Sequence, residues 1–461
     1  MSIRVGESEH APAFPKGART LLTNDQLRRN VRRATDIIRA KRGKVVAEMP
    51  DWEQLRESAK QIKTNVLRNL DQYLEQFEAN CTKAGGHVHW ANDADEANRI
   101  IADLIKGHGQ NEVIKVKTMT SDETQLNKAL LAEGIIPYET DLADLIIQLG
   151  EDKPSHIVVP ALHRNKSEIR DIFIEKMGLS HLGREPEDLA TAARTYLRER
   201  FLRVPVGYSG ANFAIAETGS VCVVESEGNG RMCVTLPKIL ITMLGIEKII
   251  PNFDDLEVFL QLLPRSATGE RMNPYNSIWT GVTPGDGPQE FHVILLDNGR
   301  TKVLADPESR STLHCIRCAA CLNACPVYRQ TGGHAYGSIY SGPIGAILTP
   351  QLQNMEHSQS LPYASSLCGA CYEVCPVKID IPEILIHLRR RLVEAGYSPF
   401  TERMGMKAAA YAMTDSGRLA GVQTLVKIGE PIQNLVMSAW TDSRDLPSAP
   451  KQTFRQWWAN R

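Results

Sequence analysis

The sequence lacks any apolar run long enough to cross a membrane. Its longest runs, such as ILITMLGI at 239–246, fall far short of the roughly 20 residues that a spanning helix needs. The N-terminal stretch MSIRVGESEHAPAFPKGA has no apolar core of the kind that a secretory signal contains. We therefore expect a cytoplasmic protein with neither a signal peptide nor a transmembrane segment.

An excess of charge of one sign is also missing. The 461 residues carry a formal net charge of −1, and only 6% of them are aromatic. Residues 24–44 are basic, but no aromatic side chains alternate with the basic ones to stack on bases, so we expect a solvated helix face and no nucleic-acid partner. No G-x-G-x-x-G follows a predicted strand and no P-loop lysine motif is present, which argues against a nucleotide cofactor.

Cysteine is sparse except in two short runs in the last third of the chain. Seven of the ten cysteines lie in these runs, whereas Cys81, Cys222 and Cys233 are scattered. Such clustering is typical of metal binding rather than of a disulfide framework, and it fits a reducing compartment.

The first run reads HCIRCAACLNACPVY at 314–328. Its cysteines Cys315, Cys318, Cys321 and Cys325, followed by Pro326, have the spacing C-x2-C-x2-C-x3-C-P of bacterial ferredoxin ligands. Gaps of two residues allow the thiolates to converge on one cubane cluster while the backbone turns around it. Zinc sites usually show two separated C-x2-C pairs or mixtures of cysteine and histidine, so the run predicts an iron–sulfur centre.

The second run, CGACYEVCPV at 368–377, has one cysteine fewer. Cys368, Cys371 and Cys375 match the last three cysteines of the first run, and Ser365 stands where the first one would be. In two-cluster ferredoxins the fourth cysteine of each run binds the other cluster. By analogy, we expect a first cluster on Cys315, Cys318, Cys321 and Cys375, and a second on Cys325, Cys368 and Cys371.

The second cluster is therefore one thiolate short. It is either a three-iron cluster or a four-iron cluster whose last iron takes Ser365, another side chain or solvent. Alternatively, a distant group such as Cys222, Cys233 or a histidine completes it. Local hydrogen bonding or surface exposure is the more usual role for the three histidines nearest in sequence, which are His314, His334 and His357.

Strand and helix patterns alternate in the first half of the chain. We expect one long amphipathic helix over 51–83. Predicted strands at 87–90, 113–119, 135–141 and 156–161 then alternate with predicted helices at 93–106, 121–133, 142–149 and 165–177. This order predicts a parallel sheet with helices on both faces. Ligands of such sheets bind beyond the carboxyl ends of the strands, where the sequence offers Lys117, Thr118, Thr120, Ser121, Glu139, Thr140 and Asp141.

Further strands are expected between residues 211 and 304. A strand pair is predicted around Glu217, strands are predicted within 239–250 and at the start of 291–304, and 269–291 reads as a long loop. Glu217 is a candidate nucleophile or base at a strand end, although a turn carboxylate without chemistry is the more usual interpretation.

The region around and beyond the cysteines is expected to be helical. The glycines and tyrosines of 328–350 suit close packing over a cluster, and helices are predicted at 379–396 and within 402–440. Trp457 and Trp458 either cap the core or offer an anchor for a partner. Four regions result: an N-terminal helical arm (1–84), an α/β domain (85–305), a helical ferredoxin domain (306–400) and a C-terminal helical region (401–461).

Several segments carry a resemblance to a known family. ETDLADLIIQL at 139–149, NFAIAETGS at 212–220 and the two cysteine runs together resemble the iron–sulfur subunit of the bacterial lactate utilisation system, the lactate utilisation protein B family. The resemblance covers nearly the full length. It implies an α/β fold, namely a Rossmann-like, CoA-transferase-like lactate-utilisation domain followed by an all-helical two-cluster ferredoxin domain. It further implies that the missing cysteine at position 365 belongs to the family pattern.

The same resemblance implies the function. Members of that family act with two further lactate-utilisation proteins to oxidise L-lactate to pyruvate, so we expect a redox component that is peripheral to the membrane only through its partners. Oxidising a 2-hydroxy acid releases two electrons, and a cluster accepts one at a time. No flavin or nicotinamide motif is present, so hydride chemistry would fall to a partner. The alternative is a non-redox enzyme, with hydratase-like use of an open iron or acyl chemistry at Glu217.

Overall fold

The computed structural model describes residues 12–353, 355–429, 441, 445, 448 and 450–461. The chain divides into two compact units, Met1–Arg391 and Leu392–Arg461, and the first of them contains both cysteine runs. Among the helices in the described ranges, none has the length and hydrophobicity that crossing a membrane requires.

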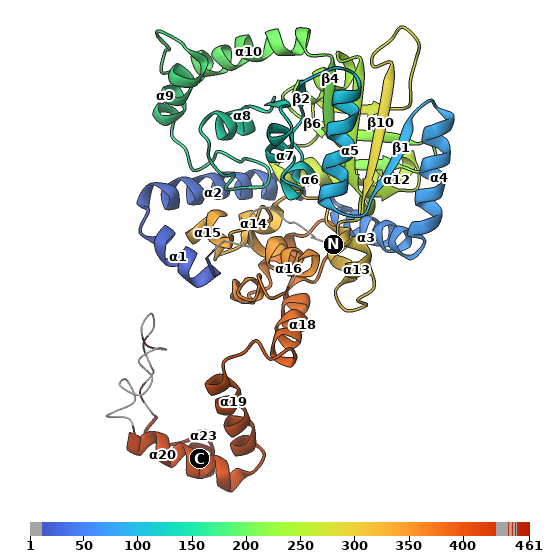
Figure 1. Cartoon of the computed structure of the whole chain (residues 1–461). Coiled ribbons are helices and arrows are strands. Elements are labelled where there is room, and N and C mark those ends of the chain that lie inside the picture. The colour runs from blue at the N-terminus through green and yellow to red at the C-terminus, as the bar shows by residue number, and fades with distance from the viewer. Residues whose placement is uncertain (1–11, 354, 430–440, 442–444, 446–447, 449) are drawn as a thin grey trace. The chain divides into compact units, whose positions relative to one another are not determined.

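A six-stranded parallel sheet forms the centre of the first unit (Figure 1). Its strand order is β1-β10-β7-β4-β2-β3, and every neighbouring pair is parallel. The predicted parallel sheet is therefore confirmed. The strands are β1 (His87–Ala91), β2 (Glu112–Lys115), β3 (Ile136–Glu139), β4 (Val206–Gly210), β7 (Ile239–Gly245) and β10 (Glu290–Leu296).

Both faces of this sheet are covered, as expected for buried parallel strands. Along β10, Ile294 and Leu296 pack on one face, whereas Val293 and Leu295 pack on the other. The first face is covered by α5 (Ala94–Gly107) and α7 (Leu126–Ala132). The second is covered by α4 (Leu70–Lys83), α11 (Asn229–Thr235) and a four-stranded sheet that the sequence did not predict as a separate layer. That sheet has the order β8-β5-β6-β9 and consists of β5 (Phe213–Ile215), β6 (Ser220–Glu225), β8 (Ile249–Ile250) and β9 (Tyr275–Trp279).

Two strand predictions differ from the structure. The strand predicted at 156–161 is wrong, because these residues form bends and turns. The reason is local: the Nδ1 atom of His156 accepts the N–H groups of Val158 and Val159, both at 3.0 Å, so those donors are not available for a strand pair. Residues 269–291 are not one loop, since β9 lies within them and pairs with β6.

Two helix predictions also need correction. The long helix predicted over 51–83 is two helices, α3 (Trp52–Arg68) and α4, which part at Asn69, whose side chain bonds back to the carbonyl of Asn65 at 3.0 Å. The helix predicted over 121–133 is likewise α6 (Met119–Glu123) followed by α7. Gln125 separates these two helices, because it adopts a left-handed backbone conformation with φ of 55°.

The other helices of the α/β part agree with the pattern more closely. Asp93 begins α5 by accepting the N–H of Glu96 at 3.0 Å, as its position before the helix predicts. The remaining helices of this part are α8 (Leu142–Leu149), α9 (Lys166–Met177), α10 (Pro186–Arg203), η2 (Ile246–Lys248), α12 (Phe253–Ala267) and α13 (Arg300–Leu304).

The cysteine region of the first unit is helical, as predicted. Three helices from the start of the chain, α1 (Phe14–Leu22), α2 (Asp25–Ala47) and α3, pack against it. Its own helices are η3 (Arg310–His314), α14 (Ala320–Ala324), α15 (Tyr328–Thr331), η4 (His334–Tyr336), α16 (Gly342–Leu352), η5 (Leu361–Tyr363), α17 (Ala370–Val374) and α18 (Ile381–Glu394).

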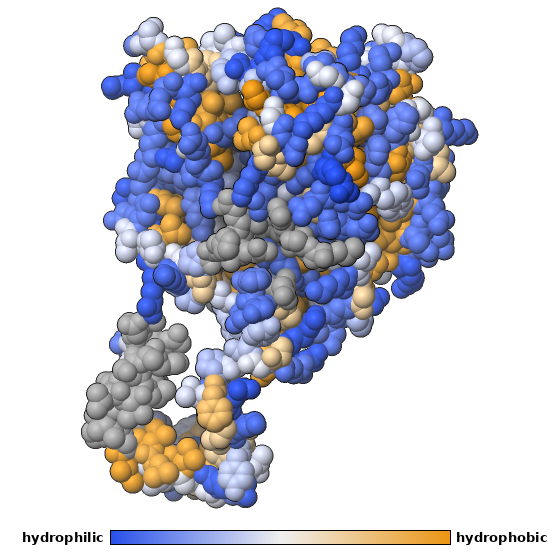
Figure 2. Space-filling model, viewed as in Figure 1, coloured by the Kyte–Doolittle hydropathy of each residue, from blue (hydrophilic) through white to orange (hydrophobic). Residues whose placement is uncertain are grey.

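The described part of the second unit contains α19 (Phe400–Met413), α20 (Ser416–Gly429) and α23 (Phe454–Ala459). Helices α19 and α20 lie where one or two helices are predicted within 402–440, and residues 430–440 of that range lie outside the described ranges. Trp457 and Trp458 are 39% and 62% exposed, and both roles predicted for them stay predictions. Figure 2 shows hydrophobic residues at the surface of this unit.

Candidate iron–sulfur centres and the adjacent cavity

The two cysteine runs adopt the same backbone conformation. Arg317 and Ala319 both have φ of 61° just before α14, and Leu367 and Gly369 have φ of 54° and 83° just before α17. The N–H of Arg317 donates to the Sγ atom of Cys315 at 3.4 Å. In the second run the N–H of Leu367 donates to the Oγ atom of Ser365 at 3.1 Å. Ser365 therefore occupies the place that Cys315 has in the first run.

The fold brings the seven cysteines together in two neighbouring groups. Burial first, and then the charges of Cys375 and Cys315, raise the pKa of Cys318 to about 12. Burial, followed by the charges of Cys325 and Cys368, raises the pKa of Cys371 to about 12. A free thiol with such a pKa stays protonated at neutral pH, so the thiolate form would depend on a bound metal. Cys321 lies close to Cys315 and Cys318, but also to Cys371 and Cys375, so the two groups adjoin at this residue. That these residues bind iron, and in which sets, stays a prediction.

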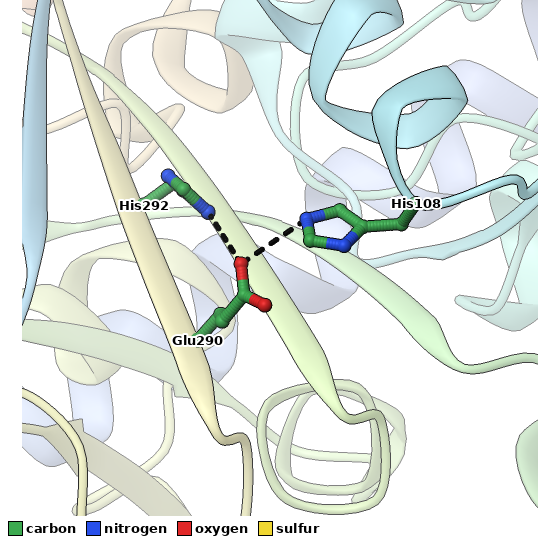
Figure 3. A group of neighbouring side chains, drawn as sticks. All are labelled: His108, Glu290 and His292. Atoms are coloured by element: carbon green, nitrogen blue, oxygen red, sulfur yellow. Dashed lines mark hydrogen bonds and ion pairs between the residues drawn. The ribbon is translucent and has the colours of Figure 1, made fainter.

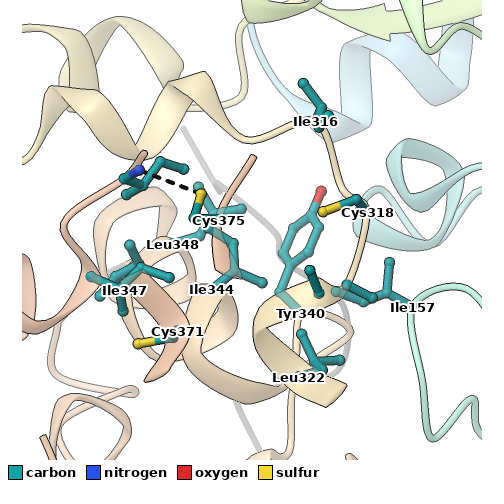
Figure 4. Close-up of a cluster of buried hydrophobic side chains, with 14 of the residues drawn as sticks. Ile157, Ile316, Cys318, Leu322, Tyr340, Ile344, Ile347, Leu348, Cys371 and Cys375 are labelled. Carbon is teal, nitrogen blue, oxygen red and sulfur yellow. Dashed lines mark hydrogen bonds between the residues drawn. The ribbon is translucent and has the colours of Figure 1, made fainter. Parts of the chain in front are cut away.

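Most of these thiols are shielded from water. Cys318, Cys325, Cys371 and Cys375 are at most 8% exposed, whereas Cys368 is exposed. Figure 4 shows Cys318, Cys371 and Cys375 in an apolar layer that α16 contributes to. All eleven residues of α16 are buried, as are Tyr328, Tyr336 and Tyr340. The segment 328–350 thus covers the cysteines, as its glycines and tyrosines predict.

Several buried hydrogen-bond donors near the cysteines are consistent with a bound group that supplies hydrogen-bond acceptors. The Tyr336 hydroxyl is buried and lies beside the thiol of Cys325. The Nε atom of Arg42 and the Nδ2 atom of Asn323 are buried with no hydrogen-bond partner in the described part of the chain. Buried donors normally have a partner, and the sulfur atoms of iron–sulfur clusters accept such hydrogen bonds. The seven thiols, as metal ligands, and these hydrogen-bond donors without a partner together are compatible with iron–sulfur clusters.

Arginines from the N-terminal helices hold the second run in place. Arg56 of α3 donates to the carbonyls of Cys375 at 2.9 Å and Tyr372 at 3.1 Å, and Arg42 of α2 donates to the carbonyl of Val374 at 3.1 Å. These carbonyls lie at the end of the short helix α17, where those of Tyr372 and Cys375 also accept the N–H groups of Cys375 and Lys378, both at 3.2 Å. Residues 24–44 were predicted to form a solvated helix face, but Arg42 is only partly exposed. The other basic residues of this stretch that are exposed, as predicted, are Arg29, Arg32, Arg33, Arg39, Lys41 and Lys44.

A chain of buried ion pairs joins the parallel sheet to the first run. Arg300 contacts Glu123 at 2.8 Å and Glu247 at 2.5 Å, and both carboxylates are almost fully buried. Arg317 contacts the other oxygen of Glu247 at 3.2 Å and donates to the carbonyl of Cys315 at 3.2 Å. Burial alone would raise the pKa of Glu247, but Arg300 and Arg317 lower it to about 2. The loop that bears the first thiols is therefore anchored to the α/β part.

A cavity of about 650 Å³ lies beyond the carboxyl ends of β2 and β4 and reaches Arg317. Four of the seven strand-end residues predicted to bind a ligand line it, namely Lys117, Thr118, Thr120 and Asp141. Glu139, Ser121 and Thr140 do not line it; Glu139 is instead paired with the buried Lys115 at 2.7 Å.

Sequence reasoning missed most of the lining of this cavity. Lys248, Asn212 and Arg317 reach it from three separate segments. Burial first, and then the charge of Arg317, lower the pKa of Lys248 to about 8, so its ammonium form prevails at neutral pH. Glu217 does not line the cavity and is exposed in the turn between β5 and β6.

The remaining candidate ligands lie in different places. Cys222 is on β6, and Cys233 is on α11 with its Sγ atom 3.4 Å from the Thr140 hydroxyl. His334 bonds to the carbonyl of Lys153 at 2.8 Å. His357 is exposed, whereas His314 is buried next to Cys315.

A second polar group lies at the opposite, amino end of the sheet (Figure 3). The Oε2 atom of Glu290 is 3.1 Å from Nε2 of His108 and 3.5 Å from Nε2 of His292. The Nδ1 atom of His292 is also 3.1 Å from Nε2 of His89. Burial first, and then the charge of His89, lower the pKa of His292 to about 4. The alternation in HVHW and EFHV could have revealed this group, because His87 and His89 share a face of β1 with His292 of β10.

Family models match two successive parts of this chain. A family model described as the LUD domain matches residues 74–296, and a 4Fe-4S dicluster domain matches residues 311–379. A crystal structure of a DUF162 family protein from Deinococcus radiodurans aligns with 98% of its own chain and 50% of this one, at 13% identity and a TM-score of 0.29, a likeness too low to carry an argument.

Full-length relatives are similar over the whole chain. Lactate utilization protein B of Bacillus licheniformis is 44% identical, over 100% of this chain and 98% of the relative. The protein of the same name from Bacillus subtilis (strain 168) is 43% identical, again over 100% of this chain and 98% of the relative. That from Exiguobacterium sp. is 44% identical over 94% of both chains. The chain, an α/β LUD domain followed by a helical 4Fe-4S dicluster domain, therefore belongs to the lactate utilization protein B family.

Proposed function

We propose that this protein is the iron–sulfur electron-transfer subunit of a multiprotein system that oxidises L-lactate to pyruvate. The observation that carries the proposal is the assembly of seven thiols in two adjacent groups, one beside a ligand-sized cavity and one that reaches the surface at Cys368. Membership of the family supports the link to lactate, and the match to a dicluster domain supports the presence of iron–sulfur clusters.

Two clusters are proposed, each a one-electron carrier when bound, which together match the two electrons of a 2-hydroxy acid. Cys315, Cys318, Cys321 and Cys375 would hold a four-iron cluster. Cys325, Cys368 and Cys371 would hold the second, which is a three-iron cluster or a four-iron cluster with an open iron. The chain's own contribution is to orient these thiols, to donate hydrogen bonds from Tyr336 and from backbone N–H groups, and to exclude water with α16.

The oxidation itself is assigned to partners. Two further lactate-utilisation proteins would complete the system, in the cytoplasm or at the membrane through those partners. The exposed Cys368 is the proposed side of electron exchange with a partner or acceptor, because electron transfer favours the shortest path from a cluster to the surface. The alternative of acyl chemistry at Glu217 has little support, since this residue is an exposed turn carboxylate away from the cavity.

The test combines metal analysis with function. Protein purified without air should contain about eight irons with two reduced EPR signals, or about seven with an oxidised three-iron signal, together with matching sulfide. Lactate-dependent reduction in the presence of the partner proteins should be lost in Cys368→Ser but kept in Cys222→Ser and Glu217→Ala. Zinc without sulfide would overturn the proposal.

A further inference from the structure

The amino end of the parallel sheet carries a group of metal-ligand side chains that belongs to neither cysteine run. His108, Glu290 and His292 each direct one nitrogen or oxygen atom into a shared space (Figure 3), and these three atoms lie within 4.8 Å of one another. The Oε2 atom of Glu290 is 3.1 Å from Nε2 of His108 and 3.5 Å from Nε2 of His292. A tetrahedral ion with bonds of about 2.0–2.1 Å holds its ligand atoms about 3.4 Å apart, so two of the three separations already suit one.

The sheet and a helix hold these side chains in place. Glu290 and His292 are two residues apart on β10, so both project from the face of that strand that carries Ile294. That face packs against α5, and His108 directly follows this helix. The His108 side chain is 29% exposed, against 8% for His292. The ring of His108 can therefore turn towards His292 and complete the triangle, while the strand fixes the spacing of the other two ligands.

His292 also has the additional partner that a metal-binding histidine usually has. Its Nδ1 atom is 3.1 Å from Nε2 of His89 on β1, and its ring stacks on that of His87 with the centroids 5.0 Å apart. Histidines that bind a metal almost always donate their second ring N–H to a neighbour, which orients the ring. When Nδ1 of His292 donates to His89, Nε2 carries a lone pair that is directed at the space shared with Glu290 and His108.

A second group of similar composition lacks this character. Asp152, His163 and His334 also place their ligand atoms within 4.8 Å of one another. The Oδ2 atom of Asp152, however, accepts two hydrogen bonds from Arg164, at 2.5 and 2.8 Å, and Nε2 of His334 bonds to a backbone carbonyl. A metal ion there would have to displace a guanidinium. In the described ranges no lysine or arginine forms an ion pair with Glu290, so its carboxylate is available to a cation.

We propose that His108, Glu290 and His292 bind one divalent transition-metal ion of the zinc type. Two imidazole nitrogens and one carboxylate oxygen suit such an ion, whereas Mg²⁺ and Ca²⁺ take mainly oxygen ligands. Three protein ligands leave a fourth position, which a water molecule takes on the exposed side of Glu290. The ion connects the end of α5 to β10, at the end of the sheet opposite the cavity beside Arg317, so its binding is independent of the proposed electron transfer.

Zinc binding to the full chain tests the proposal. The protein is purified without air, its iron content is measured, and it is dialysed first against a chelator and then against micromolar Zn²⁺. We expect the wild type to retain about one zinc per chain. Glu290→Gln and His292→Gln should each bind it at least about tenfold more weakly, since the loss of a residue that only orients a ligand already costs about 10–100-fold. His181→Gln, which removes an exposed histidine elsewhere, should bind like the wild type.

X-ray absorption at the zinc edge of the wild type identifies the ligands without any substitution. We expect a first shell of nitrogen and oxygen at about 2.0–2.1 Å. A first shell with sulfur at about 2.3 Å would overturn the proposal, because the zinc would then lie on the cysteines. No retained zinc, or equal affinity in Glu290→Gln, would also overturn it. Equal melting temperatures of the zinc-free wild type and Glu290→Gln ensure that weaker binding is not a loss of fold, and the iron content reports on the clusters separately.

Discussion

Ser365 accepts the backbone N–H of Leu367 in the same way as Cys315 accepts that of Arg317. In each run the first side chain accepts the N–H of the residue two positions later, at 3.1 Å for the serine oxygen and 3.4 Å for the cysteine sulfur. The second run thus keeps the loop that a first ligand needs, while a hydroxyl replaces the thiol. The second group therefore lacks a thiol at position 365, although the backbone there has the conformation that a first ligand needs.

Restoring the thiol should complete the second cluster. Because the loop at position 365 already has the conformation of the loop at Cys315, Ser365→Cys places a fourth thiol without rearrangement. We expect any oxidised three-iron EPR signal to disappear and the iron content to rise from about seven to about eight per chain. Ser366→Cys, one residue away, is the matched control and should change neither quantity. An unchanged three-iron signal in Ser365→Cys would contradict the proposed ligand set.

Removing Arg300 should be among the most destabilising single changes. Arg300→Met leaves Glu123 and the Oε2 atom of Glu247 buried without their cation. Breaking one partner of a buried ion pair costs about 3–5 kcal/mol, and we expect a loss of that size in the free energy of unfolding. Denaturant unfolding measures it, with the exposed Arg310→Met as the control. A loss below about 1 kcal/mol would show that the network contributes little.

The histidine group should make the protein sensitive to mild acid. The pKa of His292 is lowered to about 4 in the folded protein, against 6.5 ordinarily. The unfolded chain therefore takes up this proton first, so stability is lost as the pH falls from about 6.5 towards 4. The loss approaches about 1.4 kcal/mol per pH unit within this window.

Variants at the histidines isolate this effect. His292→Gln should lose about 1.5 kcal/mol less than the wild type between pH 6.5 and 5, as measured by urea unfolding at each pH. The exposed His181→Gln should follow the wild type. Parallel stability curves for His292→Gln and the wild type would place the acid sensitivity elsewhere.

A single methyl group at Gly210 should disturb the cavity wall. A Cβ atom there would lie 2.3 Å from the Oγ1 atom and 2.5 Å from the Cβ atom of Thr118, whose side chain caps α6. We expect Gly210→Ala to cost about 1–3 kcal/mol of stability, as overpacking does. Gly107→Ala, where the added methyl meets nothing within 4 Å, should leave the stability unchanged. Thermal unfolding measures both variants.

Short-range patterns predicted much of the fold. The alternation of strands and helices was enough for the parallel sheet, and Asp93 marked the start of α5 correctly. The errors arose where one side chain redirects the backbone. His156 takes the N–H groups that a strand would need, and Gln125 interrupts a helix with a left-handed turn. Such effects depend on a single side-chain conformation, which hydrophobic periodicity does not record.

The candidate site was predictable in part for a similar reason. Spacing identified the seven cysteines as candidate ligands, because both runs are local and repeat one pattern, and analogy with two-cluster ferredoxins divided them into two groups. The lining of the cavity was predicted only in part. The ends of the predicted strands identified Lys117 and Asp141, but they did not identify Lys248 or Arg317. These two cations lie more than 100 residues further along the chain, and their meeting depends on how the cysteine region packs on the sheet.

The ion-pair chain from Glu123 to Arg317 also bears on how such proteins can recombine. Family models match the two regions separately, at 74–296 and 311–379, as though each were a cassette. Yet Glu247 and Arg317 come from opposite sides of that junction, with Arg300 between the two matches. A chimera that combined one of these regions with the other region of a distant relative would contain only some of the four charged residues, and the others would be buried without their partners. Successful shuffling would have to transfer Glu123, Glu247, Arg300 and Arg317 as one set.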